Sequence, residues 1–223
     1  MVLTQFVIFD MDDTLFPESD YVKSGLKTIS EFLISEYKIQ DFYSHSYALY
    51  KKGVRGEIFN LTLNQMDITF DDTFILKLVE MYRNHLPQIK LFEDAKWVLT
   101  YLKTRKKTGL LTDGYANSQM NKVKALDIQD AFDFIVYTDL LGKDKWKPHK
   151  LPYLTMMEYF KGHGNEYVYV GDNPLKDFVT AKSLGWKTIQ VCRTTGEYLQ
   201  VKVDEIHDAD LQISSLRELS NYI

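Results

Sequence analysis

Three aspartates, Asp10, Asp12 and Asp13, follow the first apolar run of the chain. On an extended segment the side chains of residues 10 and 12 project to the same side, so two carboxylates are expected next to each other just beyond a buried strand. Such a pair is electrostatically costly unless a cation or a shared proton relieves the repulsion. An acidic turn without a chemical role is the alternative, since aspartate is common where strands end. Asp13 is expected to face the opposite side of the strand.

Polar motifs that could bind an anion or a metal follow three later apolar runs. They are Thr112-Asp113-Gly114, Lys147-Pro148, and Gly171-Asp172 with Asp177. Thr112 offers a hydroxyl beside the free N–H groups of a helix start, which can bind an anion. Each motif also has an ordinary interpretation, as a helix cap for Thr112 and Asp172 and as solvated charge for lysines 143, 145 and 147. Pro148 restrains the backbone beside Lys147, which makes Lys147 the candidate among these lysines.

Short apolar runs predict the strands that position these motifs. The runs are uninterrupted rather than alternating, which is typical of strands buried on both faces of a parallel sheet. They are Phe6–Phe9, Gly109–Leu111, Phe134–Tyr137, Tyr167–Val170, Thr188–Val191 and, more weakly, Ala209–Ile213. Helical patterns separate the later runs, at Asp94–Lys106, Tyr115–Leu126, Leu151–Phe160 and Pro174–Leu184. This alternation predicts an α/β protein with a doubly wound, Rossmann-like parallel sheet.

The stretch between the first and second strands is too long for a single crossover helix. It has helical patterns throughout, at Tyr21–Tyr37, Phe42–Lys52, Ile58–Met66 and Asp72–His85. We therefore predict a Rossmann-like catalytic core of residues 1–15 and 91–223. A small all-α domain of residues 16–90 is predicted as an insertion after the first strand.

The topology places all of these motifs at one edge of the predicted sheet. In parallel α/β sheets the ligand lies beyond the carboxyl ends of the strands, near the point where the strand order switches. The motifs together supply carboxylates, a hydroxyl, a lysine and helix N-termini. Mg²⁺ prefers oxygen ligands and keeps waters and phosphate oxygens around it. The combination predicts a site for Mg²⁺ and a phosphate, which no single motif predicts alone.

Composition argues against several other classes of protein. Lys and Arg number 27 and Asp and Glu number 31, and a net charge of −4 argues against binding to nucleic acid or to anionic membranes. The apolar share of 45% and charged share of 26% are typical of soluble globular proteins, and we expect a monomer or homodimer. The sequence contains no apolar run of about 18 residues, so no membrane-spanning helix is predicted. Cys192 is the single cysteine of the 223 residues, so a reducing, cytoplasmic location is expected.

The sequence resembles the haloacid dehalogenase superfamily of phosphohydrolases over nearly its whole length, from Phe6 to about Leu216. The first motif of that family, Asp-x-Asp-x-Thr, is matched at Asp10, Asp12 and Thr14. The later motifs are matched at Thr112, at Lys147-Pro148, and at Gly171-Asp172 with Asp177. A helical insertion between the first two motifs corresponds to the type-one cap of the family. The opening FDMDDTLFPE is similar to the branch that contains nucleotidases and acylsugar-phosphate phosphatases.

This resemblance implies a Mg²⁺-dependent phosphatase that hydrolyses a small phosphorylated metabolite, either a sugar phosphate or a nucleoside monophosphate. Asp10 would attack phosphorus and form an aspartyl-phosphate. Asp12 would protonate the leaving oxygen and then deprotonate the attacking water. The family would hold Mg²⁺ with the Asp10 side chain, the Asp12 carbonyl and the Asp172 side chain.

The resemblance also assigns the residues around the phosphoryl group. The phosphate-binding positions would be Thr112, Asp113, Gly114 and Lys147. Thr14 and Asp177 would orient the groups that touch the metal and the phosphate. The cap and the loop leading to it would select the substrate, with candidate contacts at Phe16, Glu18, Lys51, Lys52 and Arg55. Position 113 departs from the family, in which asparagine is common, and an aspartate there would repel bound phosphate unless its side chain turns away.

Other functions remain open at this point. A phosphomutase on the same core would need a cap that protects the aspartyl-phosphate from water, and the sequence has no clear signature of one. A dehalogenase has no leaving oxygen to protonate, so Asp12 argues against it. A catalytically silent phosphate-binding or partner-binding module is the last alternative, and the presence of Asp10, Lys147 and Asp172 argues against that.

Overall fold

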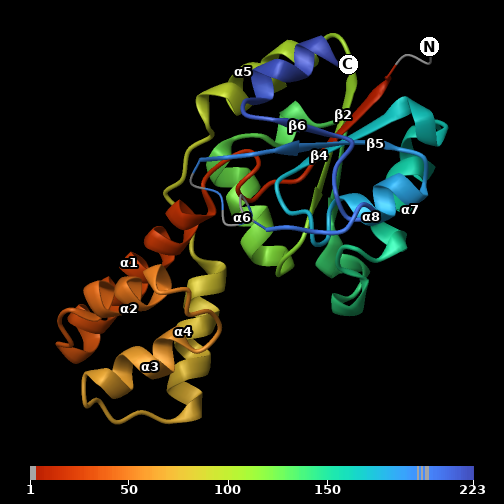
Figure 1. Ribbon diagram of the computed structural model, residues 1–223. Helices are drawn as coiled ribbons and strands as arrows, with labels where there is room; N and C mark the ends of the chain where they lie inside the picture. Colours follow the sequence, from red (N-terminus) through yellow and green to blue (C-terminus); the bar gives the residue numbers. More distant parts are fainter. Residues whose placement is uncertain (1–3, 195, 197, 199–200) are drawn as a thin grey trace. The chain divides into compact units, whose positions relative to one another are not determined.

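In the computed structural model, the apolar runs form a six-stranded sheet of order β3-β2-β1-β4-β5-β6 (Figure 1). The structure describes residues 4–194, 196, 198 and 201–223. The strands are β1 (Phe6–Phe9), β2 (Lys107–Thr112), β3 (Phe134–Tyr137), β4 (Tyr167–Gly171), β5 (Lys187–Val191) and β6 (Leu211–Ile213). Every neighbouring pair is parallel. The predicted α/β class with a doubly wound parallel sheet is therefore confirmed.

Helices cover both faces of this sheet, which is why β1 is buried along its whole length (Figure 1). Phe6 and Ile8 belong to a core cluster that also contains Tyr153 of α7 and Phe178 of α8. Val7 and Phe9 alternate with them and so point to the opposite face. The α-helices that flank the sheet in the described residues are α5 (Glu93–Leu102), α6 (Ala116–Leu126), α7 (Lys150–Phe160) and α8 (Phe178–Ser183).

The helix predicted at Pro174–Leu184 begins later than expected, at Phe178. Residues 174–176 form a turn instead of the first helical turn. Two side chains bind the backbone there: the Asn173 Oδ1 accepts from Leu175 N at 3.0 Å, and the Asp177 carboxylate accepts from Asn173 N at 3.0 Å. The prediction of a helix start at Pro174 is therefore wrong: residues 174–176 form a separate turn, in which Lys176 N and Asp177 N donate to the Asn173 carbonyl, and the helix follows it.

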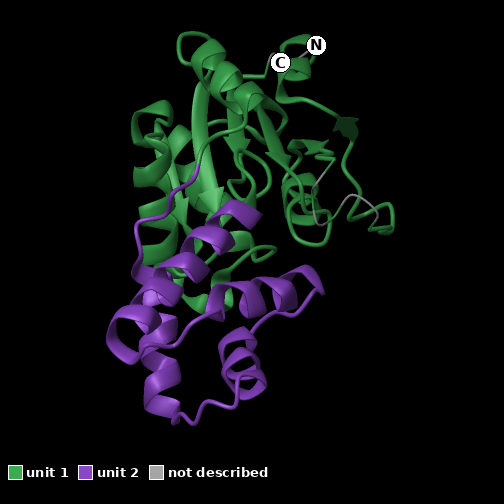
Figure 2. Cartoon of the chain, turned by 90° about the vertical axis from the view of Figure 1, so that its left-hand side faces the viewer, with its two compact units in different colours: residues 1–18, 90–223 green, residues 19–89 purple. Residues whose placement is uncertain are grey.

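The chain divides into two compact units, residues 1–18 with 90–223 and residues 19–89 (Figure 2). The second unit contains the helices α1 (Glu18–Tyr37), α2 (Phe42–Lys51), α3 (Ile58–Gln65) and α4 (Asp72–Asn84). The apolar faces of these helices bury a core of their own, formed by Val22, Leu26, Ile29, Leu33, Phe42, Phe59, Leu63 and Leu78. None of the helices in the described part of the chain is long and apolar enough to cross a membrane.

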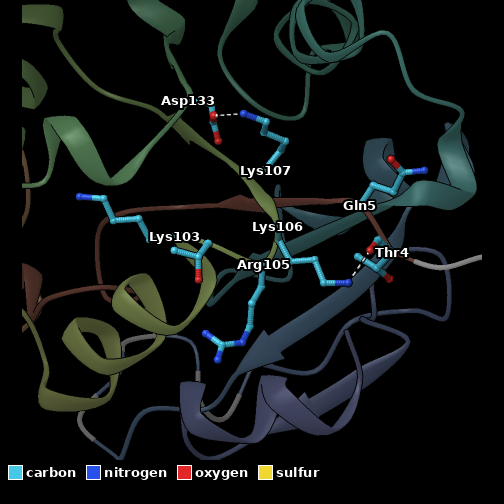
Figure 3. Close-up of a pocket in the computed structure, with 8 residues that line it drawn as sticks. Thr4, Gln5, Lys103, Arg105, Lys106, Lys107 and Asp133 are labelled. Carbon is cyan, nitrogen blue, oxygen red and sulfur yellow. Dashed lines mark hydrogen bonds and ion pairs between the residues drawn. The ribbon is translucent and has the colours of Figure 1, made fainter.

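The amino end of the sheet has a shallow basic pocket (Figure 3). Its lining residues are Thr4, Gln5, Lys103, Thr104, Arg105, Lys106, Lys107 and Asp133. Lys107 pairs with Asp133 at 2.7 Å, and Lys106 donates to the carbonyl of Thr4 at 2.6 Å. Thr4 and Gln5 directly precede β1, and Lys107 is the first residue of β2. The pocket therefore lies at the edge of the sheet opposite the acidic motifs.

Candidate active site

The acidic and hydroxyl motifs meet at the carboxyl ends of three neighbouring strands, β2, β1 and β4. Asp10 follows β1 and Asp172 follows β4, the two strands between which the order of the sheet switches. Both carboxylates are buried, with 5% and 6% of the residue exposed. Thr112 ends β2, the strand next to β1, and is fully buried. The topology rule applied to the sequence thus places these residues correctly at one edge.

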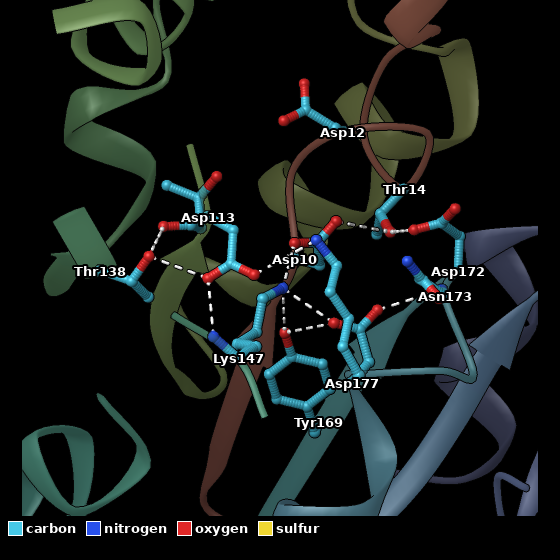
Figure 4. A network of polar contacts seen from close by, with 12 residues as sticks. Asp10, Asp12, Thr14, Asp113, Thr138, Lys147, Tyr169, Asp172, Asn173 and Asp177 are labelled. Carbon is cyan, nitrogen blue, oxygen red and sulfur yellow. Dashed lines mark hydrogen bonds and ion pairs between the residues drawn. The ribbon is translucent and has the colours of Figure 1, made fainter. Parts of the chain in front are cut away.

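A tight turn after β1 sets the positions of the first motif. Thr14 N donates to the carbonyl of Asp12 at 2.7 Å, and Leu15 N donates to Met11 at 2.9 Å. The turn brings the Thr14 hydroxyl to 3.4 Å from Asp10 Oδ2 and 3.3 Å from Asp172 Oδ1, so it bridges the two carboxylates (Figure 4). Both contacts are long for an O–H donor, so the hydroxyl lies between the two carboxylates without a short hydrogen bond to either.

Asp13 has a structural role in the same turn. Its backbone has a φ of 51°, in the left-handed region that aspartate tolerates better than most residues. Its Oδ1 accepts from Glu18 N at 2.9 Å, at the start of α1. Asp13 therefore orders the entry to α1. It lies in a turn and not on the strand, and its charge contributes to the raised pKa of Asp172, so the expectation that it faces the opposite side of the strand is not confirmed.

Lys147 links the carboxylates of two strands. Its ammonium is 2.5 Å from Asp10 Oδ1, 2.8 Å from Asp177 Oδ1 and 3.0 Å from the hydroxyl of Tyr169 (Figure 4). Its side chain is 0% exposed, and these contacts occupy all three N–H donors of a lysine. Asp177 is anchored in turn by Asn173 N, which donates to its other oxygen. Tyr169 was not predicted, because an aromatic residue within an apolar run is indistinguishable from core packing.

Burial and crowding of acids shift the pKa values of this centre. Burial raises the pKa of Asp10 to about 6, against the opposing charge of Lys147. Burial and then the charges of Asp10 and Asp177 hold the pKa of Asp172 well above its usual range. Burial opposes the charge of Lys147, but Asp10 and Asp177 raise its pKa well above the ordinary lysine value. Strongly shifted groups in one place indicate a functional site.

Oxygen atoms of Asp10, Asp172 and Asp177 lie within 4.8 Å of one another and could hold a metal ion. One lysine, Lys147, contacts two of these three carboxylates, so the cluster keeps an excess of negative charge. A hard divalent cation such as Mg²⁺ fits an all-oxygen donor set of this kind. Asp177 belongs to the cluster although the sequence assigned it only an orienting role. Asp12 does not belong to it through its side chain.

The side chain of Asp12 is held by α6 and not by the Asp10 group (Figure 4). Lys122 Nζ lies 2.6 Å from Asp12 Oδ1, and Gln119 Nε2 lies 2.9 Å from Asp12 Oδ2. Both partners are buried, although they are polar. Sequence reasoning missed them. The available signal was their place on the same helix face as the apolar Val123 and Leu126.

Thr112 and Asp113 differ in how their side chains are bonded. The buried hydroxyl of Thr112 has no hydrogen-bond partner among the described residues. Asp113 Oδ1 accepts from Thr138 Oγ1 at 2.8 Å and from Lys147 N at 3.0 Å, and Oδ2 lies 3.2 Å from Lys176 Nζ. Burial would raise the pKa of Asp113, but Lys147 and Lys176 outweigh it and lower the pKa. The site tolerates the negative charge of Asp113 because Thr138, Lys147 N and Lys176 contact its carboxylate.

The predicted substrate-selecting residues are distributed over both units. Phe16 is buried, with Lys122 Nζ 5.8 Å from the centre of its ring. Glu18 begins α1. In the helical unit, Arg55 donates to the carbonyls of Tyr50 and Val54 and stacks 4.2 Å above the Tyr50 ring. The selection of a substrate by these residues stays a prediction.

Comparison with known proteins identifies relatives along the whole chain. The profile of a family described as haloacid dehalogenase-like hydrolase matches residues 7–191. Glyceraldehyde 3-phosphate phosphatase of Pyrococcus furiosus is 27% identical over 220 residues, which cover 96% of this chain and 90% of that protein. The enzyme of the same name from Methanocaldococcus jannaschii is 28% identical over 228 residues, which cover 97% and 96%.

Solved structures share the fold. The HAD-hydrolase YfnB from Bacillus subtilis, bound to magnesium, superposes with a TM-score of 0.72 at 16% identity. The superposition covers 99% of this chain and 98% of that one. An identity this low shows a common architecture and does not extend to the substrate.

Proposed function

This chain belongs to the haloacid dehalogenase-like hydrolase family, whose profile matches residues 7–191, and on that premise we propose that it is a phosphatase of a small phosphorylated metabolite. The single observation that supports phosphate binding best is the buried hydroxyl of Thr112 at the end of β2, which has no hydrogen-bond partner in the part of the chain that the structure describes. A buried hydroxyl without a partner is costly, and an oxygen of a bound phosphate would accept its hydrogen bond. A sugar phosphate is the first class to test, because two relatives are named glyceraldehyde 3-phosphate phosphatase.

Asp10 is the proposed nucleophile. Its carboxylate attacks phosphorus, an Asp10–phosphorus bond forms and the bond to the ester oxygen breaks. Asp12 enters this step in its protonated form and gives that proton to the departing alkoxide, so that an alcohol leaves and the Asp12 carboxylate remains. Asp12 then takes a proton from water as that water attacks phosphorus, which releases phosphate and restores Asp10. Lys147 keeps Asp10 oriented throughout, at 2.5 Å.

The acidic cluster supports a requirement for Mg²⁺. Asp10 and Asp172 would hold the ion, with Asp177 beside them and the Asp12 carbonyl as a further ligand. The bound ion supplies positive charge that screens the phosphate from the carboxylates. Without added positive charge, burial and repulsion raise the pKa of both Asp10 and Asp172 and so oppose the ionised form that attacks phosphorus. The helical unit, residues 19–89, would act as the cap that selects the substrate and excludes water.

The test is hydrolysis of a generic aryl phosphate by the wild-type protein and by Asp10→Asn. We expect turnover that requires Mg²⁺, stops with EDTA and falls by about 10³-fold or more in the variant. Asp204→Asn is the matched control, because its side chain is 63% exposed. The same substitution there should leave turnover unchanged.

A panel of sugar phosphates and nucleoside monophosphates would then rank the substrates. Release of inorganic phosphate identifies a phosphatase, whereas an isomerised phosphate ester without phosphate release would identify a mutase. A folded wild-type protein that neither binds Mg²⁺ nor turns over any phosphate ester would overturn the proposal.

A further inference from the structure

The Asp113–Lys176 pair is a further lysine–carboxylate contact in the site, beside those of Lys147 and Lys122, and the mechanism above does not use it. Asp113 directly follows Thr112, and Lys176 directly precedes Asp177. The two side chains therefore come from the loops that hold the proposed phosphate-binding hydroxyl and the acidic cluster. Their contact joins the end of β2 to the loop after β4 at 3.2 Å.

Lys147 and Lys176 differ in the number of N–H donors that remain free for another acceptor. All three N–H donors of Lys147 are engaged, and its side chain is 0% exposed. Lys147 could donate to a phosphate only by releasing a carboxylate or Tyr169. Within the described part of the chain, the Lys176 ammonium has Asp113 as its hydrogen-bond acceptor. Its side chain is 33% exposed, and this one acceptor leaves two of its three N–H donors for an anion.

The two carboxylate oxygens of Asp113 differ in the number of hydrogen-bond donors that fix them. Oδ1 is fixed by two donors, the Thr138 hydroxyl and Lys147 N. Oδ2 faces Lys176 alone among the described residues, at a distance longer than either contact of Oδ1. The carboxylate therefore stays in place when Lys176 moves, because its anchors do not depend on Lys176. Lys176 also acts on the charge of Asp10, so its ammonium lies within electrostatic reach of the nucleophile.

We propose that Lys176 is a second phosphate-binding lysine of this site and that Asp113 competes with the phosphate for it. The inference rests on the proposed function and deepens it. The pair sets how tightly the site holds a phosphate dianion: Asp113 draws the cation away from the anion, which weakens binding and favours release of product. Replacing Asp113 by asparagine keeps an acceptor for Thr138 and Lys147 N but removes the charge that competes for Lys176.

The experiment is calorimetric titration of inorganic phosphate into the Mg²⁺-loaded protein, with aryl phosphate turnover measured alongside. Lys176→Met is expected to weaken phosphate binding by about tenfold, as the loss of one charge-assisted hydrogen bond implies. Lys176→Arg should restore binding to within about threefold of wild type, because it keeps the charge. Asp113→Asn should tighten phosphate binding several-fold and slow product release.

A double variant shows whether Asp113 weakens phosphate binding by competing for Lys176 or by repelling the phosphate directly. If Asp113 acts through Lys176, Asp113→Asn has no effect on phosphate affinity in the Lys176→Met background. A gain that persists in that background means that Asp113 repels the phosphate directly, and the inference is then wrong. Thermal unfolding of each variant confirms that it is folded.

Lys107→Met is the matched control, because Lys107 makes a lysine–aspartate pair with Asp133 at the opposite edge of the sheet. It should leave phosphate affinity unchanged, and an equal loss there would overturn the assignment. If the wild type binds phosphate and turns over ester while Lys176→Met binds phosphate equally well, this inference fails and the phosphatase proposal stands. If the wild type does neither, the phosphatase proposal itself fails.

Discussion

Asp10 and Asp94 are both carboxylates paired with one cation, yet their pKa values move in opposite directions. Burial raises the pKa of Asp10 to about 6 despite Lys147. Burial acts in the same sense on Asp94, but hydrogen bonds from Arg193, Leu216 N and Ser215 outweigh it and lower the pKa. The presence of a cation therefore does not explain why the pKa values of Asp10 and Asp94 shift in opposite directions. The difference lies in the deeper burial of Asp10 and in the balance between acids and donors around each carboxylate.

At Asp94, one carboxylate receives several donors. Arg193 Nη1, Leu216 N and Ser215 Oγ lie 2.7, 2.8 and 3.0 Å from the same oxygen. Arg193 also donates to the carbonyl of Thr14 at 2.7 Å. This is a structural link that joins α5, the turn after β1 and the C-terminal segment. At Asp10, in contrast, three buried acids lie together, and the ammonium of Lys147 contacts two of them, Asp10 and Asp177. That deficit of positive charge favours binding of a cation and costs stability until one is bound.

The largest expected effect comes from removing the cation of the centre. Lys147→Met leaves Asp10 and Asp177 buried without their ammonium. We expect turnover of aryl phosphate to fall by about 10³-fold and the free energy of unfolding to fall by about 3–5 kcal/mol. Urea denaturation and steady-state kinetics measure the two losses. Lys145→Met is the control two residues away, where the lysine side chain is 33% exposed and pairs with Asp144. Activity within tenfold of wild type in Lys147→Met would contradict the role assigned to Lys147.

Mg²⁺ is expected to stabilise the folded protein, because it binds the native acidic cluster and not the unfolded chain. At a concentration of about 100 Kd the gain is about 2.7 kcal/mol, or about 5–10 °C in Tm for a chain of this size. Differential scanning calorimetry with and without the ion measures the shift. Asp172→Asn should abolish most of it, whereas Asp133→Asn at the amino end of the sheet should keep it in full. An equal shift in both variants would mean that the ion binds elsewhere.

The sequence was sufficient for features that depend on local pattern and general topology. The run Phe6–Phe9 is a buried strand because its residues are apolar without alternation, and the rule for parallel sheets then places Asp10 and Asp172 together. Contacts between distant polar side chains could not be predicted. Lys122 and Asp12 are 110 residues apart, and Arg193 and Asp94 are 99 apart. Their pairing depends on helix placement and side-chain length, which hydrophobic periodicity does not specify.

The metal-free protein should lose stability as the pH rises through the range of Asp10. Its folded pKa of about 6 lies above the unfolded value near 4, so the native state binds more protons between these limits. The free energy of unfolding is therefore expected to fall from about pH 4 to pH 6 in EDTA. Asp10→Asn should remove much of this fall. Asp133→Asn should not, since the lowered pKa of Asp133 confines its effect to lower pH. A flat profile for wild type would show that Asp10 is not destabilised by its surroundings.

Asp94 should show the opposite dependence with a smaller amplitude. Its folded pKa lies below the unfolded value, so it stabilises the protein above about pH 4 and loses this effect as the pH falls through the folded pKa. Asp94→Asn is expected to cost about 1.5 kcal/mol at pH 7 and progressively less below pH 4, where the wild-type carboxylate is itself being protonated. Urea denaturation at pH 7 and near pH 3 measures the difference. A cost that is the same at both values would mean that Asp94 acts through packing. In that case the pH dependence of the free energy of unfolding would no longer distinguish the binding site at Asp10 from the structural ion pair at Asp94.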